Sequence, residues 1–286
     1  MGWLERWRPR RRWRRPADRW PPSGRVALGV LVTVTVLALS GPLLAPHRPT
    51  EILGRPYALP GALPGAPLGT DSLGRDVLSR VLCGGRDVVL DGLLATALSC
   101  LAGVLVGLVA ALQSARRRWV DSVLMRPLDA LAALPPLLLL LLPLAAVPGR
   151  PALLLAVVLG GLPLTARVLR AAAATAAQRS HVEAAVARGE RLPWLLGREL
   201  LPFVSGPLLA DAGIRFVQSV YLVVAVGFLG LSTGAADWGL LINEAIPGAS
   251  LQPWALLVPV LLVALLAVSA NLVADVAARR SRALLA

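Results

Sequence analysis

Apolar residues in this chain gather into long blocks separated by shorter polar stretches. A helix that crosses a membrane needs ~20 predominantly apolar residues, and six blocks approach or exceed that length. These blocks are Val26–Ala45, Val88–Leu112, Leu124–Val147, Ala152–Leu169, Gly206–Leu231 and Trp254–Val276. The pattern therefore predicts an all-α, polytopic membrane helix bundle with six transmembrane helices.

A few charged residues interrupt these blocks. Asp91 lies in the second block, Arg126 and Asp129 near the start of the third, and Asp211 and Arg215 in the first half of the fifth. Charged residues inside a membrane are functional candidates by default. Asp211 and Arg215, however, are four residues apart on one helix face and can neutralise each other. We expect structural pairing within both pairs, Arg126 with Asp129 and Asp211 with Arg215.

The composition is typical of a membrane protein, and the distribution of charge predicts which side of the membrane each loop occupies. Hydrophobic residues make up 56% of the chain and charged residues 16%, a low share for a soluble domain. With the N-terminus placed inside, 22 of the 29 basic residues, all arginine, fall on the inside pieces, and 6 fall outside. Because positive loops stay in the cytoplasm, both termini are predicted to be cytoplasmic.

The predicted organisation follows from these assignments. The chain divides into a basic Arg/Trp N-terminal segment (1–25), a first transmembrane helix (26–45), an extracytoplasmic segment (46–87), a five-helix core (88–276) and a cytoplasmic tail (277–286). The first apolar run exceeds the ~7–15 residues of a signal-peptide core, so we expect an uncleaved helix. The Arg/Trp segment is interpreted as a topology anchor on membrane lipid, with a partner-binding arm as the alternative, and no nucleic-acid partner is expected.

Few residues are suited to catalysis or metal binding. The two cysteines, Cys83 and Cys100, form no disulfide framework. His47 and His181 are predicted on opposite sides of the membrane, so no metal site is expected. The sequence contains no GxxxxGK[ST] phosphate loop, which argues against ATP binding by that route. A membrane-embedded enzyme is therefore the less favoured alternative, and no cofactor is expected in this chain.

The cytoplasmic stretch between the fourth and fifth blocks, about residues 171–205, is the most informative. Its sequence predicts a short helix, a turn at a glycine that can take positive φ, and a second short helix, a form suited to docking a partner. The residues that carry the pattern are Glu183, Ala184, Ala185, Gly189, Leu201 and Pro202.

This pattern resembles the EAA loop of type I ABC importer permeases. The resemblance implies that the loop docks on an ATP-hydrolysing subunit and transmits its closure to the helices. Two residues depart from the family pattern: Glu199 stands where the subfamily usually has His, and Pro193 lies between the two expected helices.

A second segment, GTDSLGRDVLSR before the second block, narrows the resemblance. Asp71, Arg75, Asp76 and Arg80 fall at helix-like spacing and can pair, and we expect a structural role rather than solute contact. The segment resembles the signature of dipeptide, oligopeptide and nickel importer permeases, specifically the second, or C, permease. The signature residues are Gly69, Thr70, Asp71, Gly74, Arg75 and Asp76.

The resemblance implies a complete importer around this chain. It would be a multi-pass subunit in the bacterial cytoplasmic (inner) membrane that imports short peptides or a related small solute by alternating access. Its implied partners are a second homologous permease in a heterodimer, two ABC ATPases that bind ATP and Mg, and an extracytoplasmic solute-binding protein. A nickel-chelate or siderophore-like solute is the alternative.

Overall fold

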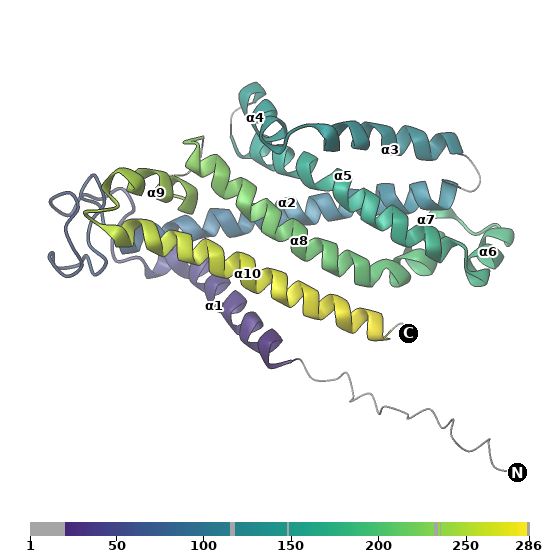
Figure 1. The fold of residues 1–286 in the computed structure, drawn as a ribbon, viewed down its shortest axis with the longest axis horizontal. Helices are drawn as coiled ribbons and strands as arrows, with labels where there is room; N and C mark the ends of the chain where they lie inside the picture. The colour runs from purple at the N-terminus through teal and green to yellow at the C-terminus, as the bar shows by residue number, and fades with distance from the viewer. Residues whose placement is uncertain (1–20, 115–117, 148, 232–233, 235, 285–286) are drawn as a thin grey trace, which may run out of the picture.

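The computed structural model is an elongated bundle of helices (Figure 1). It describes residues 21–114, 118–147, 149–231, 234 and 236–284, so most of the predicted Arg/Trp segment lies outside the described residues. The α-helices are α1 (Pro22–Leu44), α2 (Val77–Ser114), α3 (Arg118–Ala133), α4 (Pro136–Ala146), α5 (Arg150–Ala177), α6 (Ser180–Ala187), α7 (Leu192–Trp194), α8 (Leu201–Phe228), α9 (Trp238–Ala245) and α10 (Pro253–Leu284). A π-helical turn, η1 (Leu195–Leu200), and a 3₁₀ turn, η2 (Ile246–Gly248), complete the described elements.

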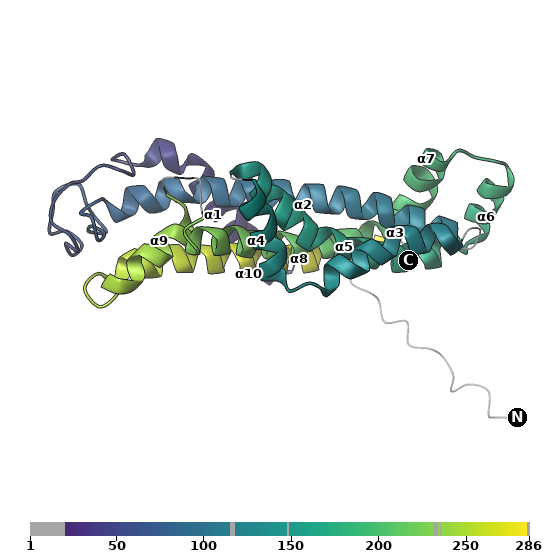
Figure 2. The ribbon, with the colours of Figure 1, turned by 90° about the horizontal axis from the view of Figure 1, so that it is seen from above.

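Five of these helices are long and apolar enough to cross a membrane. They are α1, α2, α5, α10 and the continuous run of α7, η1 and α8. The long helices lie side by side along the length of the molecule, as the views in Figures 1 and 2 agree. The all-α, polytopic fold predicted from the apolar blocks is confirmed.

The third predicted span, Leu124–Val147, is not one straight helix. Helices α3 and α4 meet at an angle of 97° across a short break at Leu134 and Pro135. Pro135 and Pro136 are the cause, because proline lacks the backbone N–H that a helix interior needs and disfavours helical geometry in the residue before it. The fold therefore has six spans only if this bent pair is counted as one.

Two boundaries also differ from the sequence prediction. Helix α2 begins at Val77 rather than Val88, because the Asp76 carboxylate caps it by accepting the backbone N–H of Ser79 at 3.0 Å. Helix α10 continues to Leu284, so the tail predicted from residue 277 is helical over most of its length. The sequence prediction ended each helix where the apolar residues end, but both helices continue into polar sequence.

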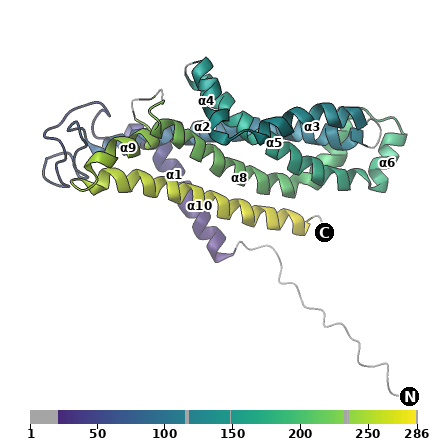
Figure 3. The same cartoon turned by 45° about the horizontal axis from the view of Figure 1, so that its top comes forward.

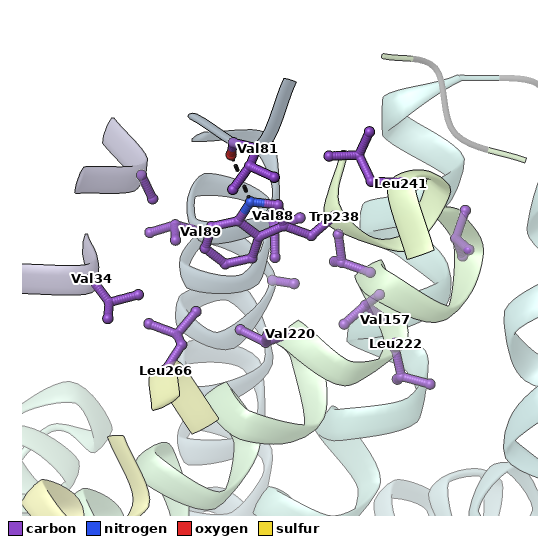
Figure 4. Packing of buried hydrophobic residues seen from close by; sticks show 14 of the residues in the cluster. Val34, Val81, Val88, Val89, Val157, Val220, Leu222, Trp238, Leu241 and Leu266 are labelled. Carbon is purple, nitrogen blue, oxygen red and sulfur yellow. Dashed lines mark hydrogen bonds between the residues drawn. The ribbon is translucent and has the colours of Figure 1, made fainter. Parts of the chain in front are cut away.

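The largest buried side chain of the core belongs to Trp238, at the first residue of α9. Its side chain is 1% exposed, and its indole Nε1 donates to the carbonyl oxygen of Val81 at 2.9 Å. Figure 4 shows Val81, Val88 and Val89 beside the ring. A buried indole needs a partner for its N–H, and this bond fixes α9 against the start of α2.

A polar group within the bundle joins α5 to α8. Thr165 Oγ1 donates to Asp211 Oδ2 at 2.6 Å, and Arg215 Nε lies 3.4 Å from Asp211 Oδ1. The expected pairing of Asp211 with Arg215 is therefore confirmed. The expected pairing of Arg126 with Asp129 is wrong, because Asp129 instead binds Arg167 of α5 at 2.7 Å.

Replacing Thr165 with valine is expected to destabilise the protein by about 1–3 kcal/mol, because the buried Asp211 carboxylate loses its donor. Thr175→Val is the matched control, since the hydroxyl of Thr175 is exposed and bonds only to Ala172 of its own helix. Thermal unfolding of the purified chain in detergent measures both variants. Equal melting temperatures for the two variants would contradict the assignment.

Candidate functional site

The two sets of residues predicted to be functional lie at opposite ends of the bundle (Figures 1 and 3). The end that carries α6 and α7 also carries the end of α10. The opposite end carries residues 45–76, which form turns and bends, together with α9. We call these the α6 end and the α9 end.

At the α6 end, one face of α6 is anchored to the bundle and another faces outward. Val182 and Ala185 are buried in a cluster with Leu195 and Leu200 of η1 and with residues of α2 and α5. Ser180, Glu183, Ala184 and Ala187 follow helical spacing and are exposed. We call these four residues the α6 outer face.

The chain reverses at Gly189, as the sequence predicts. Gly189 has a φ of +77°, and a Cβ at this position would meet no atom within 4 Å. The backbone conformation, rather than lack of space, is therefore what favours glycine here.

The expected second short helix is instead continuous with a long one. Leu192–Trp194 and the π-helical turn Leu195–Leu200 lead directly into α8. Pro193 occupies the first turn of α7, where a missing N–H costs little, so it does not separate two helices. Leu201 and Pro202 are the first two residues of α8; Leu201 packs against the buried cluster and Pro202 is exposed.

Side-chain contacts link the start of α6 to η1, which carries Glu199, and to the start of α8. Glu199 Oε2 lies 3.8 Å from His181 Nε2. The His181 ring lies 5.0 Å from the ring of Phe203, centre to centre, and the Arg179 guanidinium lies 4.4 Å above that ring. Arg179 and Phe203 were missed by the sequence analysis, and their pairing across 24 positions leaves no local signal.

At the α9 end, the Asp71 carboxylate is the centre of a buried ionic network. Asp71 Oδ2 accepts from Arg75 Nε at 2.8 Å and from Arg80 Nη1 at 2.5 Å. Both arginines also bind Glu244 of α9, at 3.0 Å and 2.6 Å. Arg80 is 1% exposed and Asp71 is 7% exposed. We call Asp71, Arg75, Arg80 and Glu244 the four-charge network.

Burial alone would raise the pKa of Asp71. The backbone N–H groups of Arg75 and Leu73 and the charges of Arg80 and Arg75 outweigh burial and hold the pKa of this carboxyl below its ordinary value. Asp71 is therefore ionised at neutral pH, as the network requires. Glu244 was missed by the sequence analysis, because it lies more than 160 residues from its partners.

The other signature residues shape the turn that presents Asp71. Gly69 and Gly74 both have a φ of +78°, and a Cβ on either would lie 2.1 Å from a backbone carbonyl oxygen. Thr70 is fully buried, and its hydroxyl accepts from the Ala58 N–H and donates to the Arg55 carbonyl. Asp76 caps α2 and does not pair with Arg80, so the expected pairing is confirmed for Asp71 and wrong for Asp76.

Comparison with known proteins gives consistent results. The family described as binding-protein-dependent transport system inner membrane component matches residues 103–283. A di/tripeptide transport system permease of Pseudomonas aeruginosa is 33% identical over 260 residues, covering 87% of this chain and 85% of that protein. A dipeptide transport system permease of Haemophilus influenzae is 27% identical, covering 87% and 86%.

The fold has a likeness among solved structures. An inward-facing structure of the MetNI methionine ABC transporter aligns with a TM-score of 0.53 and 18% sequence identity, covering 69% of this chain and 96% of that one. At this identity the likeness concerns the fold alone.

Proposed function

The chain belongs to the family of binding-protein-dependent transport system inner membrane components, and from this premise we propose that it is the permease subunit of an ATP-driven importer of short peptides. The observation that carries the proposal is the α6 outer face, which presents Glu183 and Ala184 to solvent while the buried side of the same helix is anchored in the bundle. A helix whose exposed face carries small residues, and whose other face is packed into the bundle, is suited to docking a protein partner.

The proposed coupling runs through contacts on both sides of α6. A short turn joins α6 to α5, and the contacts of His181 with Glu199 and Phe203 join it to η1 and to the start of α8. A partner that displaces α6 therefore displaces α5 and α8 with it. Displacement of two spanning helices is the kind of rigid-element motion that alternating access needs.

The proposed division of labour leaves ATP to other subunits. No GxxxxGK[ST] sequence occurs in the chain, so ATP and Mg would bind two partner ATPases docked at the α6 end. A second permease would complete the solute path in a heterodimer, and an extracytoplasmic binding protein would deliver solute at the α9 end. The names of the relatives favour peptides over a nickel chelate or a siderophore-like solute.

Uptake by the assembled importer tests this proposal. Proteoliposomes that contain the permease pair, the ATPases and the binding protein are expected to accumulate a labelled di- or tripeptide only with ATP. The control omits this chain. Uptake of a nickel chelate, with none of any short peptide, would contradict the peptide assignment.

The proposed orientation predicts the accessibility of two engineered cysteines. In a variant with Cys83 and Cys100 replaced by alanine, a cysteine replacing Leu73 at the α9 end should react with an impermeant thiol reagent applied from outside. Leu73 is 57% exposed. A cysteine replacing the exposed Ser180 should react only after the membrane is opened. The reverse pattern would place the α6 end outside.

A further inference from the structure

A cavity at the α9 end has walls of two different kinds. It lies between α2, α4, α5, α8 and the start of α9 and has a volume of about 150 Å³, well above the ~10–15 Å³ that one water needs. Its charged lining residues are Asp87, Asp91, Arg150 and Asp237. Much of the remainder is aliphatic, from side chains such as Leu153 and Val223.

The charged groups of this cavity do not balance. Asp87 and Asp91 are one turn apart on α2, and Arg150 Nε donates to Asp91 Oδ1 at 2.6 Å. Asp237 is 6% exposed, and its Oδ1 caps α9 by accepting the Leu240 N–H at 2.9 Å. Its Oδ2 is buried and has no hydrogen-bond partner among the described residues. Three carboxylates and one guanidinium leave a formal charge of −2.

This excess of negative charge favours a cationic occupant. A buried carboxylate oxygen without a hydrogen-bond partner is costly, and a nearby positive charge offsets that cost. Across the described residues, no three His, Cys, Asp or Glu side chains are placed to hold a metal ion. The aliphatic walls instead suit a cation with a carbon frame. Because Asp87 is exposed and the Arg150 side chain is 51% exposed, the cavity is open at its charged side.

We propose that this cavity binds the protonated primary amino group of the solute as it enters from the extracytoplasmic side. Asp87 and Asp237, which Arg150 does not neutralise, supply the negative charge, and the aliphatic side chains of α5 and α8 contact the adjoining carbon atoms. This inference rests on the proposed function, since it assumes that the solute passes this end of the chain.

A binding test that needs no transport examines the cavity directly. In the full chain without native cysteines, Leu153→Cys places a thiol in the cavity wall. Millimolar n-propylammonium is expected to slow its reaction with a maleimide, whereas n-propanol, equal in size and uncharged, is not. Equal effects of the two probes, or none from either, would overturn the proposal.

A substitution at Asp237 distinguishes its proposed role in binding the ammonium group from its role in capping α9. Asp237→Asn keeps a capping oxygen and the side-chain volume but removes the charge, so protection by n-propylammonium should weaken about tenfold or more. Asp129→Asn, which removes an exposed carboxylate of α3 that does not line the cavity, is the control and should leave the protection unchanged. An unchanged melting temperature in Asp237→Asn shows that the fold is kept. If protection persists in folded Asp237→Asn, Asp237 only caps α9 and the proposal fails.

Transport separates this inference from the proposed function. In proteoliposomes, the wild-type importer should favour a free dipeptide over its N-acetylated form, and Asp237→Asn should reduce that preference about tenfold. Peptide uptake with no preference for a free amino group, or with a preference unchanged by Asp237→Asn, would overturn the cavity assignment alone. Absence of all peptide uptake would overturn the proposed function, and the protection assay would still decide the cavity.

Discussion

Replacing Arg80 with methionine is expected to lower the free energy of unfolding by about 3–5 kcal/mol, the cost of breaking a buried ionic network from one side. Arg80 joins Asp71 of the turn before α2 to Glu244 of α9 and is almost fully buried. Methionine fills similar space but leaves two carboxylates facing each other with only Arg75 between them. Unfolding of the purified chain in detergent, followed by temperature or denaturant, measures the loss.

Two further variants make this result interpretable. Arg86→Met removes an exposed arginine of α2, and its effect should stay within about 0.5 kcal/mol. Arg80→Lys should give an intermediate loss, because an ammonium keeps the positive charge but its shorter side chain does not place it where Arg80 Nη1 contacts both carboxylates. If Arg80→Met is no less stable than Arg86→Met, the four-charge network does not hold the α9 end together.

Replacing Ala184 with tryptophan is expected to abolish most solute-stimulated ATPase activity of the assembled importer. Ala184 lies on the α6 outer face, and its exposed side chain contributes nothing to the buried cluster beneath. A bulky side chain forced into a packed contact costs about 1–3 kcal/mol, which corresponds to an affinity for the ATPase about 5- to 140-fold weaker.

The control for this prediction is Ala171→Trp, at an exposed alanine of α5 that does not belong to the α6 outer face. Both variants should melt at the wild-type temperature, because neither alanine is buried. Only Ala184→Trp should lose co-purification of the ATPase and coupled hydrolysis. Normal activity in Ala184→Trp would show that the α6 outer face is not the docking surface.

The apolar pattern predicted the helical fold because burial in a membrane acts on composition over ~20 residues at a time. It failed at Pro135 and Pro136, where the surrounding leucines looked like one span. It also failed at Val77, because the cap that starts α2 is a local hydrogen bond from Asp76, invisible to hydropathy.

The functional sites divide in the same way. The turn at Gly189 and the helix carrying Glu183 are local features, so the sequence indicated them. Glu244 and Asp237 become important only because folding brings α9 against α2, across more than 150 positions. A single sequence carries no signal for a contact between residues so far apart along the chain.

The bend between α3 and α4 has a consequence for what surrounds this chain. Pro135 and Pro136 supply no backbone N–H, so carbonyl oxygens in the preceding turn lose their helical partners. The bend lies near Gly160 of α5 and Leu222 of α8, two residues within spanning helices. Lipid hydrocarbon cannot donate a hydrogen bond to a carbonyl oxygen. Irregular backbone within the membrane is therefore tolerated only where it contacts protein or water. In the assembled transporter, the bend between α3 and α4 must therefore face protein or water rather than lipid tails.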